Sequence, residues 1–149
     1  MTTDETFLWY DATPRLSVGV AFLFKQKAFR ALGAYTLSPE TAALPSLHVS
    51  AGIQEIATGN PGLSFTAEKN FRAGQGILNV YGGIGYRTNT RQAKILGGLK
   101  FSPSSLWTFG LQNDGIHTHP FATYSWSHWI TGLYLINGKS PAVLFGSRF

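Results

Sequence analysis

Residues 15–24 read RLSVGVAFLF, and the alternation within this stretch decides the fold class. One set of positions is large and apolar: Leu16, Val18, Val20, Phe22 and Phe24. The positions between them are small or polar, beginning with Arg15 and Ser17. Successive side chains of a β-strand point to opposite faces, so a period of two predicts a strand with one apolar and one polar face.

The same alternation recurs along the chain between clusters of turn residues such as ATGNPG at 57–62 and NDG at 113–115. The further segments are 28–37, 47–54, 63–68, 78–87, 93–101, 107–112, 116–126, 129–136 and 142–149. Most connections are short and the longest is 38–46. Because parallel neighbours would need long crossovers, these strands are expected to be antiparallel.

We therefore predict an all-β fold, an up-and-down antiparallel barrel of about 10 strands (8–10) with short loops. Closure is expected because an open sheet would leave two exposed edges. The whole chain, 1–149, is expected to form a single barrel domain, with residues 1–13 as an N-terminal extension or a short strand.

The composition narrows the class of protein. Charged residues make up only 13% of the chain, about half the usual share for a soluble domain. The net charge of +5 is spread along the sequence, which argues against nucleic acid as a partner. The absence of cysteine excludes disulfides and cysteine-based zinc sites. No run of about 18 apolar residues is present, so no transmembrane helix is expected.

The residue types in the two rows indicate which face looks outward. The polar row consists mainly of small residues, which suit a narrow lumen, while the apolar row is too bulky for the inside of so small a barrel. We therefore predict a transmembrane barrel whose apolar row faces lipid. The charged residues expected to line the lumen are Arg15, Arg30, Glu68, Arg87, Lys94, Lys100 and Arg148. The aromatic residues expected at the membrane interfaces are Tyr35, Tyr86, Phe101, Trp107, Trp126 and Trp129.

The lumen charges allow two interpretations. A ladder of ion pairs would rigidify the barrel, because a charge inside a narrow barrel must be paired or hydrated. A basic path would instead favour anions. We favour the ladder, since about ten strands with filled side chains leave little room for a path.

The chain ends in VLFGSRF, with Val143, Phe145 and Phe149 on one face. This resembles the terminal strand of bacterial outer-membrane barrels, which ends in Phe and carries alternate hydrophobic residues. Ser147 departs from that pattern, which has a hydrophobic residue there. The resemblance implies that Val143, Phe145 and Phe149 form a signal for the outer-membrane assembly machinery.

Two groups of residues suggest chemistry, but simpler interpretations are favoured. Three histidines could share one wall and bind a metal, yet they also suit a polar lumen or a strand end: His48, His117 and His119. Ser125, Ser127 and His128 lie close in sequence, but no nucleophile elbow accompanies them. We expect no catalytic residues, no metal, no cofactor and no enzymatic activity.

The expected function is that of an integral outer-membrane barrel with a structural, anchoring or assembly-subunit role and a narrow lumen that would favour anions. Expected partners are membrane lipid, the assembly machinery, and a protein partner or second copy, with no nucleic acid. The N-terminus, MTTDETFLWY, lacks a signal peptide. An outer-membrane location therefore predicts that one has been removed. The alternatives are a soluble lipocalin-like barrel that binds a small apolar ligand and an outer-membrane lipid-modifying hydrolase.

Overall fold

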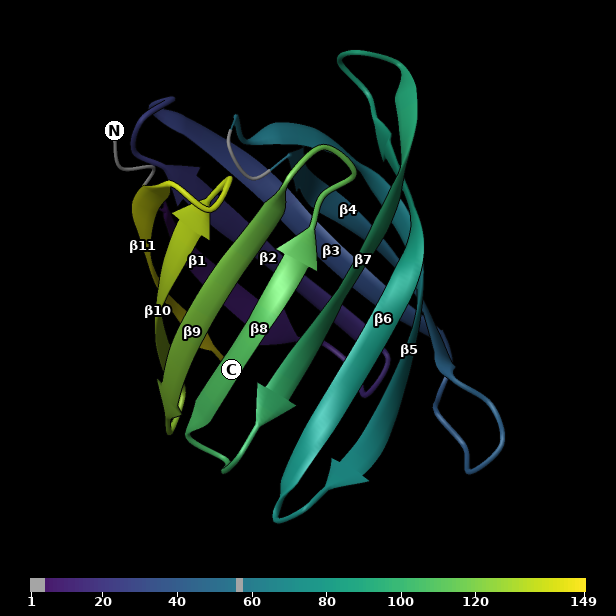
Figure 1. Cartoon of the computed structure of the whole chain (residues 1–149). Helices are drawn as coiled ribbons and strands as arrows, with labels where there is room; N and C mark the ends of the chain where they lie inside the picture. Colours follow the sequence, from purple (N-terminus) through teal and green to yellow (C-terminus); the bar gives the residue numbers. More distant parts are fainter. Residues whose placement is uncertain (1–4, 56–57) are drawn as a thin grey trace.

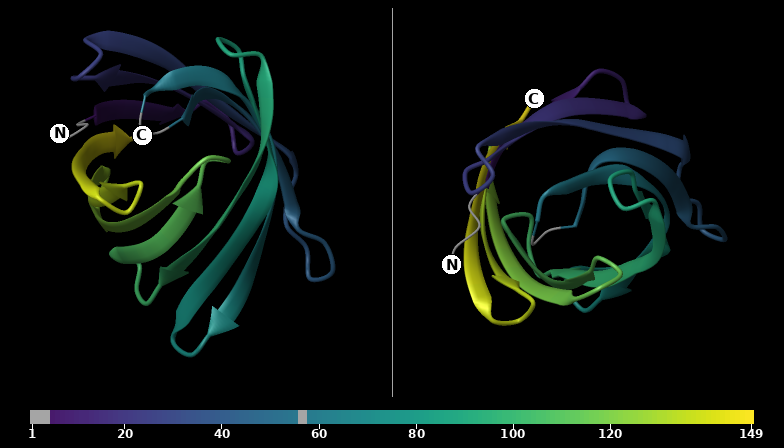
Figure 2. Two further views of the ribbon diagram at one scale, coloured as in Figure 1. Left: turned by 45° about the horizontal axis from the view of Figure 1, so that its top comes forward. Right: turned by 90° about the horizontal axis from the view of Figure 1, so that it is seen from above.

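The computed structural model describes residues 5–55 and 58–149, and within them the strands close into a barrel (Figures 1 and 2). These strands are β1 (Glu5–Asp11), β2 (Leu16–Leu23), β3 (Ala28–Ser38), β4 (Ser46–Glu55), β5 (Asn60–Ala73), β6 (Gly76–Arg87), β7 (Gln92–Ser102), β8 (Trp107–Asn113), β9 (Thr118–Trp126), β10 (Trp129–Ile136) and β11 (Ser140–Arg148). The predicted all-β barrel is confirmed, with eleven strands where about ten were expected.

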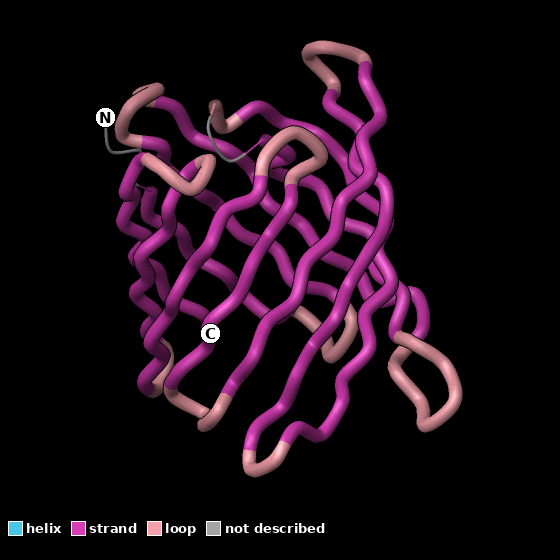
Figure 3. The backbone as a smooth tube through the Cα atoms, in the orientation of Figure 1, coloured by secondary structure: helices cyan, strands magenta, loops and turns pink. Residues whose placement is uncertain are grey.

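Turns and short loops join the strands throughout the described residues (Figure 3). These residues include no helix that is long and apolar enough to cross a membrane.

The barrel closes through a parallel pair. Every pair of consecutive strands is antiparallel, but β1 runs parallel to β11, with Glu5 opposite Leu144 and Trp9 opposite Arg148. This follows from the odd number of strands, because in an up-and-down sheet the first and eleventh strands run the same way. Within the segment 1–13, predicted as an extension or a short strand, Glu5–Asp11 is thus the closing strand of the wall, and residues 1–4 lie outside the described part of the chain.

The barrel has two rims, named here as they lie in Figure 1. The upper rim carries the β2–β3, β4–β5, β6–β7, β8–β9 and β10–β11 connections, and the lower rim carries the other five. The segment 39–45, between β3 and β4, is the longest connection in the described chain and lies at the lower rim, close to the predicted 38–46. Within residues 5–55 and 58–149 the connections are therefore short, and the strands of the wall make up most of the chain.

Bulky inward side chains on several strands lie against glycines on the neighbouring strands. A Cβ built on Gly19, Gly98, Gly110 or Gly146 would lie against Trp9, Tyr81, Phe121 or Phe7, respectively. This alternation of large and small residues lets aromatic rings lie flat in the narrow interior. The interior therefore contains pairs of an aromatic residue and a glycine on neighbouring strands, in addition to polar side chains.

Gly110→Ala is expected to destabilise the barrel by about 1–3 kcal/mol, the usual cost of overpacking. The new Cβ would lie 2.7 Å from the ring of Phe121 and 2.5 Å from the carbonyl oxygen of Leu99. Gly82→Ala is the matched control, because the nearest atom to its Cβ would be 3.8 Å away. Denaturant unfolding of both variants checks the prediction, and equal stabilities would contradict it.

Candidate functional site: the barrel wall and its interior

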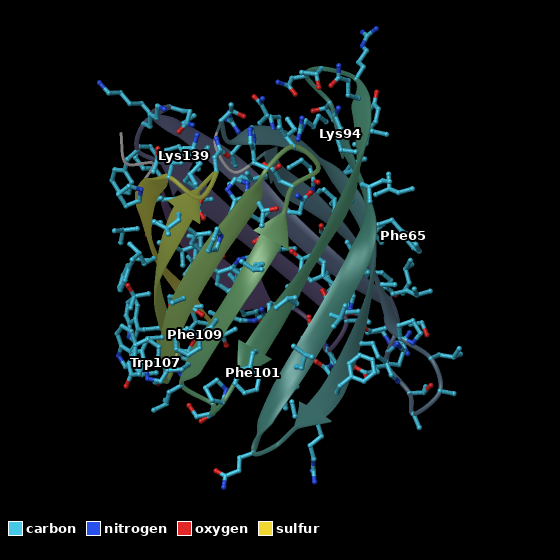
Figure 4. All side chains as sticks on the ribbon, in the orientation of Figure 1. Phe65, Lys94, Phe101, Trp107, Phe109 and Lys139 are labelled. Atoms are coloured by element: carbon cyan, nitrogen blue, oxygen red, sulfur yellow. The ribbon has the colours of Figure 1, made fainter. Side chains whose placement is uncertain are left out.

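The outer face of the wall is apolar. Phe65 is 45% exposed in β5 and Ile95 is 80% exposed in β7, and further large apolar side chains are exposed on every strand. Figure 4 shows Phe65 projecting away from the barrel, with Phe101, Trp107 and Phe109 near the lower rim. Soluble monomers rarely expose contiguous apolar patches of more than a few hundred Å². The apolar rows that the sequence predicted to face outward do so.

Aromatic side chains gather on the lower half of this outer face. The rings of Trp107 and Tyr124 are 4.9 Å apart, and those of Tyr124 and Trp126 are 5.6 Å apart. Trp126 and Trp129 are opposite each other in the β9–β10 register. The resulting band passes over β8–β11 and comprises Phe109, Trp107, Tyr124, Trp126, Trp129 and Phe145.

The six aromatic residues expected at interfaces all have exposed side chains, but they are divided unequally between the rims. Tyr86 lies near the upper end of β6. The other five lie near the lower rim: Tyr35, Phe101, Trp107, Trp126 and Trp129. Five of the six thus lie near one rim, while Phe22, Phe24 and Phe29 form an aromatic cluster beside the upper-rim β2–β3 turn. Membrane barrels carry aromatic girdles at both interfaces.

The inside of the barrel contains a polar group centred on β5, β6 and β7. Lys100 Nζ lies 3.8 Å from Glu68 Oε2, and Asn79 Nδ2 donates to the same oxygen at 3.3 Å. Lys100 Nζ also lies 5.3 Å from the centre of the Tyr81 ring. The predicted lumen residues Glu68 and Lys100 are therefore brought together as an ion pair, which matches the ladder interpretation at this position.

A second polar group is buried at the upper rim around Asp114, in the β8–β9 connection. Asp114 Oδ1 accepts hydrogen bonds from the backbone N–H groups of Ile116 and His117, both at 3.0 Å. Arg87, at the end of β6, is buried and donates to the backbone carbonyl of Asp114 at 3.1 Å. Asp114 Oδ2 lies 3.2 Å from Nε2 of His119. Three strand ends are tied together by this one aspartate.

His119 is fully buried and both of its ring nitrogens face polar groups. Nδ1 accepts a hydrogen bond from the backbone N–H of Asn137 at 3.2 Å, so Nε2 carries the proton, and this nitrogen lies 3.2 Å from Asp114 Oδ2. Burial alone would raise the pKa of Asp114, but hydrogen bonds from His119 and from the backbone N–H groups of His117 and Ile116 hold it well below its ordinary value. The ring has no nitrogen left to activate a nucleophile, so this group is structural.

The remaining charged residues expected in the lumen lie nearer the rims. Arg30 Nε donates to a backbone carbonyl of the β4–β5 connection at 3.0 Å, and Lys94 is half-buried near the upper rim. Arg15 is exposed in the turn before β2. Arg148 binds Asp11 at 2.8 Å across the β1–β11 closure, where both side chains are largely exposed. These residues occupy the ends of the barrel, above or below its middle.

The three histidines considered for metal binding are divided between the two halves of the barrel. His48 bonds to Thr36 and Ser46 in the lower half of the barrel, and His117 is exposed at the upper rim. Among residues 5–55 and 58–149, no three potential metal ligands gather. His128 stacks on Phe149 at the lower rim, with the ring centres 5.3 Å apart.

The C-terminal strand carries its alternate residues outward. Val143, Phe145 and Phe149 are exposed on the outer face. Ser147 falls between Phe145 and Phe149 in this row but is only 4% exposed, and its hydroxyl donates to the backbone carbonyl of His128 at 3.0 Å. The departure from a hydrophobic residue at this position is thereby accommodated.

The Asp114–His119 pair and the inward aromatic residues were not predicted from the sequence. The NDG turn at 113–115 marked where Asp114 lies, but no local pattern indicates that His119 reaches back to it. Phe7 and Trp9 face inward while Leu8 faces outward, so the β1 segment is apolar on both faces.

The fold and the distribution of side chains define a class: a closed up-and-down β-barrel with an apolar outer wall and a polar, partly filled interior. The chain matches no protein-family model, and comparisons with curated proteins and with solved structures find no match.

Proposed function

We propose that this chain is an integral β-barrel of a bacterial outer membrane with a structural, anchoring or assembly-subunit role. The observation that carries the proposal is the continuous outward-facing apolar row, which passes around the wall from β1 to β11. A closed barrel pairs the backbone groups of its wall with one another, the condition for crossing a bilayer with strands. Outward apolar rows and an inward polar row are the arrangement of such barrels.

A structural role is favoured over wide transport by the filling of the interior. The hollows inside are small: about 180 Å³ beside Tyr134 and Ile136, about 190 Å³ beside Glu68 and Tyr81, and about 260 Å³ beside Phe7 and Trp9. Short connections at both rims leave little surface for a receptor or an adhesin. The excess of positive side chains would make any narrow path favour anions, and the exposed residues Val143, Phe145 and Phe149 would serve the assembly machinery.

The experiment that tests the location is reconstitution. The chain should need detergent or lipid to stay in solution, and the folded form should migrate differently on an unheated gel from the heat-denatured form. After refolding into vesicles it should sediment with them through salt and alkaline washes. A monodisperse, folded protein in detergent-free buffer would contradict the proposal and favour the ligand-binding soluble barrel.

A further inference from the structure

A groove lies on the outer wall over the parallel seam between β1 and β11. Its volume is about 300 Å³ and its lining is mainly apolar. The bottom of the groove is formed by the small residues Thr6, Gly146 and Ser147, which leave space between the larger side chains on either side. The walls come from β1, β2, β3, β10 and β11: Leu8, Val20, Phe22, Phe29, Trp129 and Phe145.

The two ends of the groove lie beside opposite rims. Phe29 comes two residues after Lys27, which belongs to the upper-rim turn between β2 and β3. Trp129 directly follows His128, which belongs to the lower-rim turn between β9 and β10. Because barrel strands are tilted by roughly 35–45°, a row that crosses them climbs the wall from one rim toward the other. The groove therefore runs obliquely over the wall, from beside the upper rim toward the lower rim.

The upper end of the groove is positively charged. Lys25 and Lys27 are exposed in the 24–27 turn, whose ends are joined by the Lys27 N–H donating to the Phe24 carbonyl at 3.3 Å. Neither lysine has an ion-pair partner within the described parts of the chain. At the lower end, the charge of Arg148 is matched by Asp11. Unmatched positive charge thus lies at one end of the groove, beside Phe29.

We propose that this groove binds an acyl chain of an anionic phospholipid, with the phosphate headgroup at Lys25 and Lys27. The inference rests on the proposed membrane location. A second copy of the chain has a net charge of +5, so it does not complement the cationic end of the groove as an anionic headgroup does. The apolar walls of the groove would contact the acyl chain, and the lysines at its upper end would contact the phosphate headgroup.

The test uses tryptophan fluorescence and brominated lipid. A Trp129-only protein carries Trp9→Phe, Trp107→Phe and Trp126→Phe. It is refolded into phosphatidylcholine vesicles that contain equal small fractions of either phosphatidylglycerol or phosphatidylcholine, brominated near the chain ends. We expect brominated phosphatidylglycerol to quench Trp129 more strongly than brominated phosphatidylcholine does. A Trp107-only protein should be quenched equally by both lipids, because Trp107 lies outside the groove lining.

The lysines supply the second arm of the test. Each lysine near an anionic headgroup favours it roughly fivefold, so Lys25→Gln with Lys27→Gln should lower the preference by up to about 25-fold. Lys139→Gln is the matched control, since Lys139 is exposed at the upper rim in the β10–β11 connection and does not line the groove. It should leave the preference unchanged.

The outcomes separate this inference from the proposed function. If the protein stays with vesicles but both lipids quench Trp129 equally, or the preference survives the double glutamine variant, the lipid site is wrong and the membrane location stands. If the protein does not stay with vesicles, the membrane location and the lipid site are both wrong.

Discussion

Val49→Lys is expected to destabilise the barrel in lipid by about 2 kcal/mol, between the cost of a lysine on the lipid face at the bilayer midplane, about 2–4 kcal/mol, and that near an interface, about 0–1 kcal/mol. Val49 lies in the lower half of β4, is 37% exposed on the outer face, and is opposite Tyr35 and Phe65 in the register. In lipid the ammonium group would have no water and no acidic partner near it. Urea unfolding of the protein in vesicles measures the change.

Ser50→Lys is the matched control, one residue along the same strand. Ser50 faces the interior, where its hydroxyl lies 2.6 Å from that of Ser64 and beside the hollow that contains Glu68. The expected loss is about 1 kcal/mol, the value of one hydrogen bond. On a water-soluble barrel the order would reverse, because a surface Val49→Lys would change stability by less than about 0.5 kcal/mol. A smaller effect at Val49 than at Ser50 would contradict the proposed location.

The barrel could be predicted from sequence because its signal is local. In 15–24 the alternation is carried by ten consecutive residues, and the short turns then fix the antiparallel neighbours. The closing strand could not be predicted in the same way. In ETFLWYD, residues 5–11, Phe7 and Trp9 face the interior while Leu8 and Tyr10 are exposed. A strand with apolar side chains on both faces has no alternation to detect.

The position of the charged residues was only partly predictable, because alternation gives the face of a side chain and not its depth. Glu68 and Lys100 were assigned to the inner row and do meet inside the barrel. Arg148 belongs to the same row, but it lies at the lower rim with Asp11, where both groups are solvated. The difference depends on where each strand ends, and the stagger between strands is set by pairing across the whole sheet.

The Asp114–His119 pair arises from contacts between separate strand ends, which explains why the sequence did not indicate it. Asp114→Ala is expected to destabilise the barrel by about 2–4 kcal/mol, since each buried donor left without an acceptor costs about 1–3 kcal/mol. The backbone N–H groups of Ile116 and His117 would lose their acceptor and His119 Nε2 would lose the carboxylate beside it, while Arg87 would keep its bond to the backbone carbonyl of residue 114. Thermal or denaturant unfolding at neutral pH measures the loss.

Asp11→Ala is the control for this prediction. The Asp11–Arg148 pair has the shorter separation, 2.8 Å against 3.2 Å, but its side chains are 41% and 59% exposed. Exposed pairs contribute up to about 1 kcal/mol to stability. We therefore expect Asp11→Ala to lose less stability than Asp114→Ala, because burial matters more here than the separation of the charged atoms. If Asp11→Ala proves as damaging as Asp114→Ala, the exposed pair at the seam stabilises the barrel as much as the buried group does, and the prediction is wrong.

The same aspartate should make stability depend on pH. The pKa of Asp114 is lowered in the folded protein by hydrogen bonds that outweigh the effect of burial, so the folded state holds this carboxyl ionised at pH values where the unfolded chain would protonate it. Its contribution is fully present above the unfolded pKa of about 4 and is lost as the pH falls from there through the folded pKa. The stability of the wild type should therefore fall below about pH 4 more steeply than that of Asp114→Ala. If the free energy of unfolding falls with the same slope for both proteins below about pH 4, the pKa of Asp114 is not lowered in the folded state.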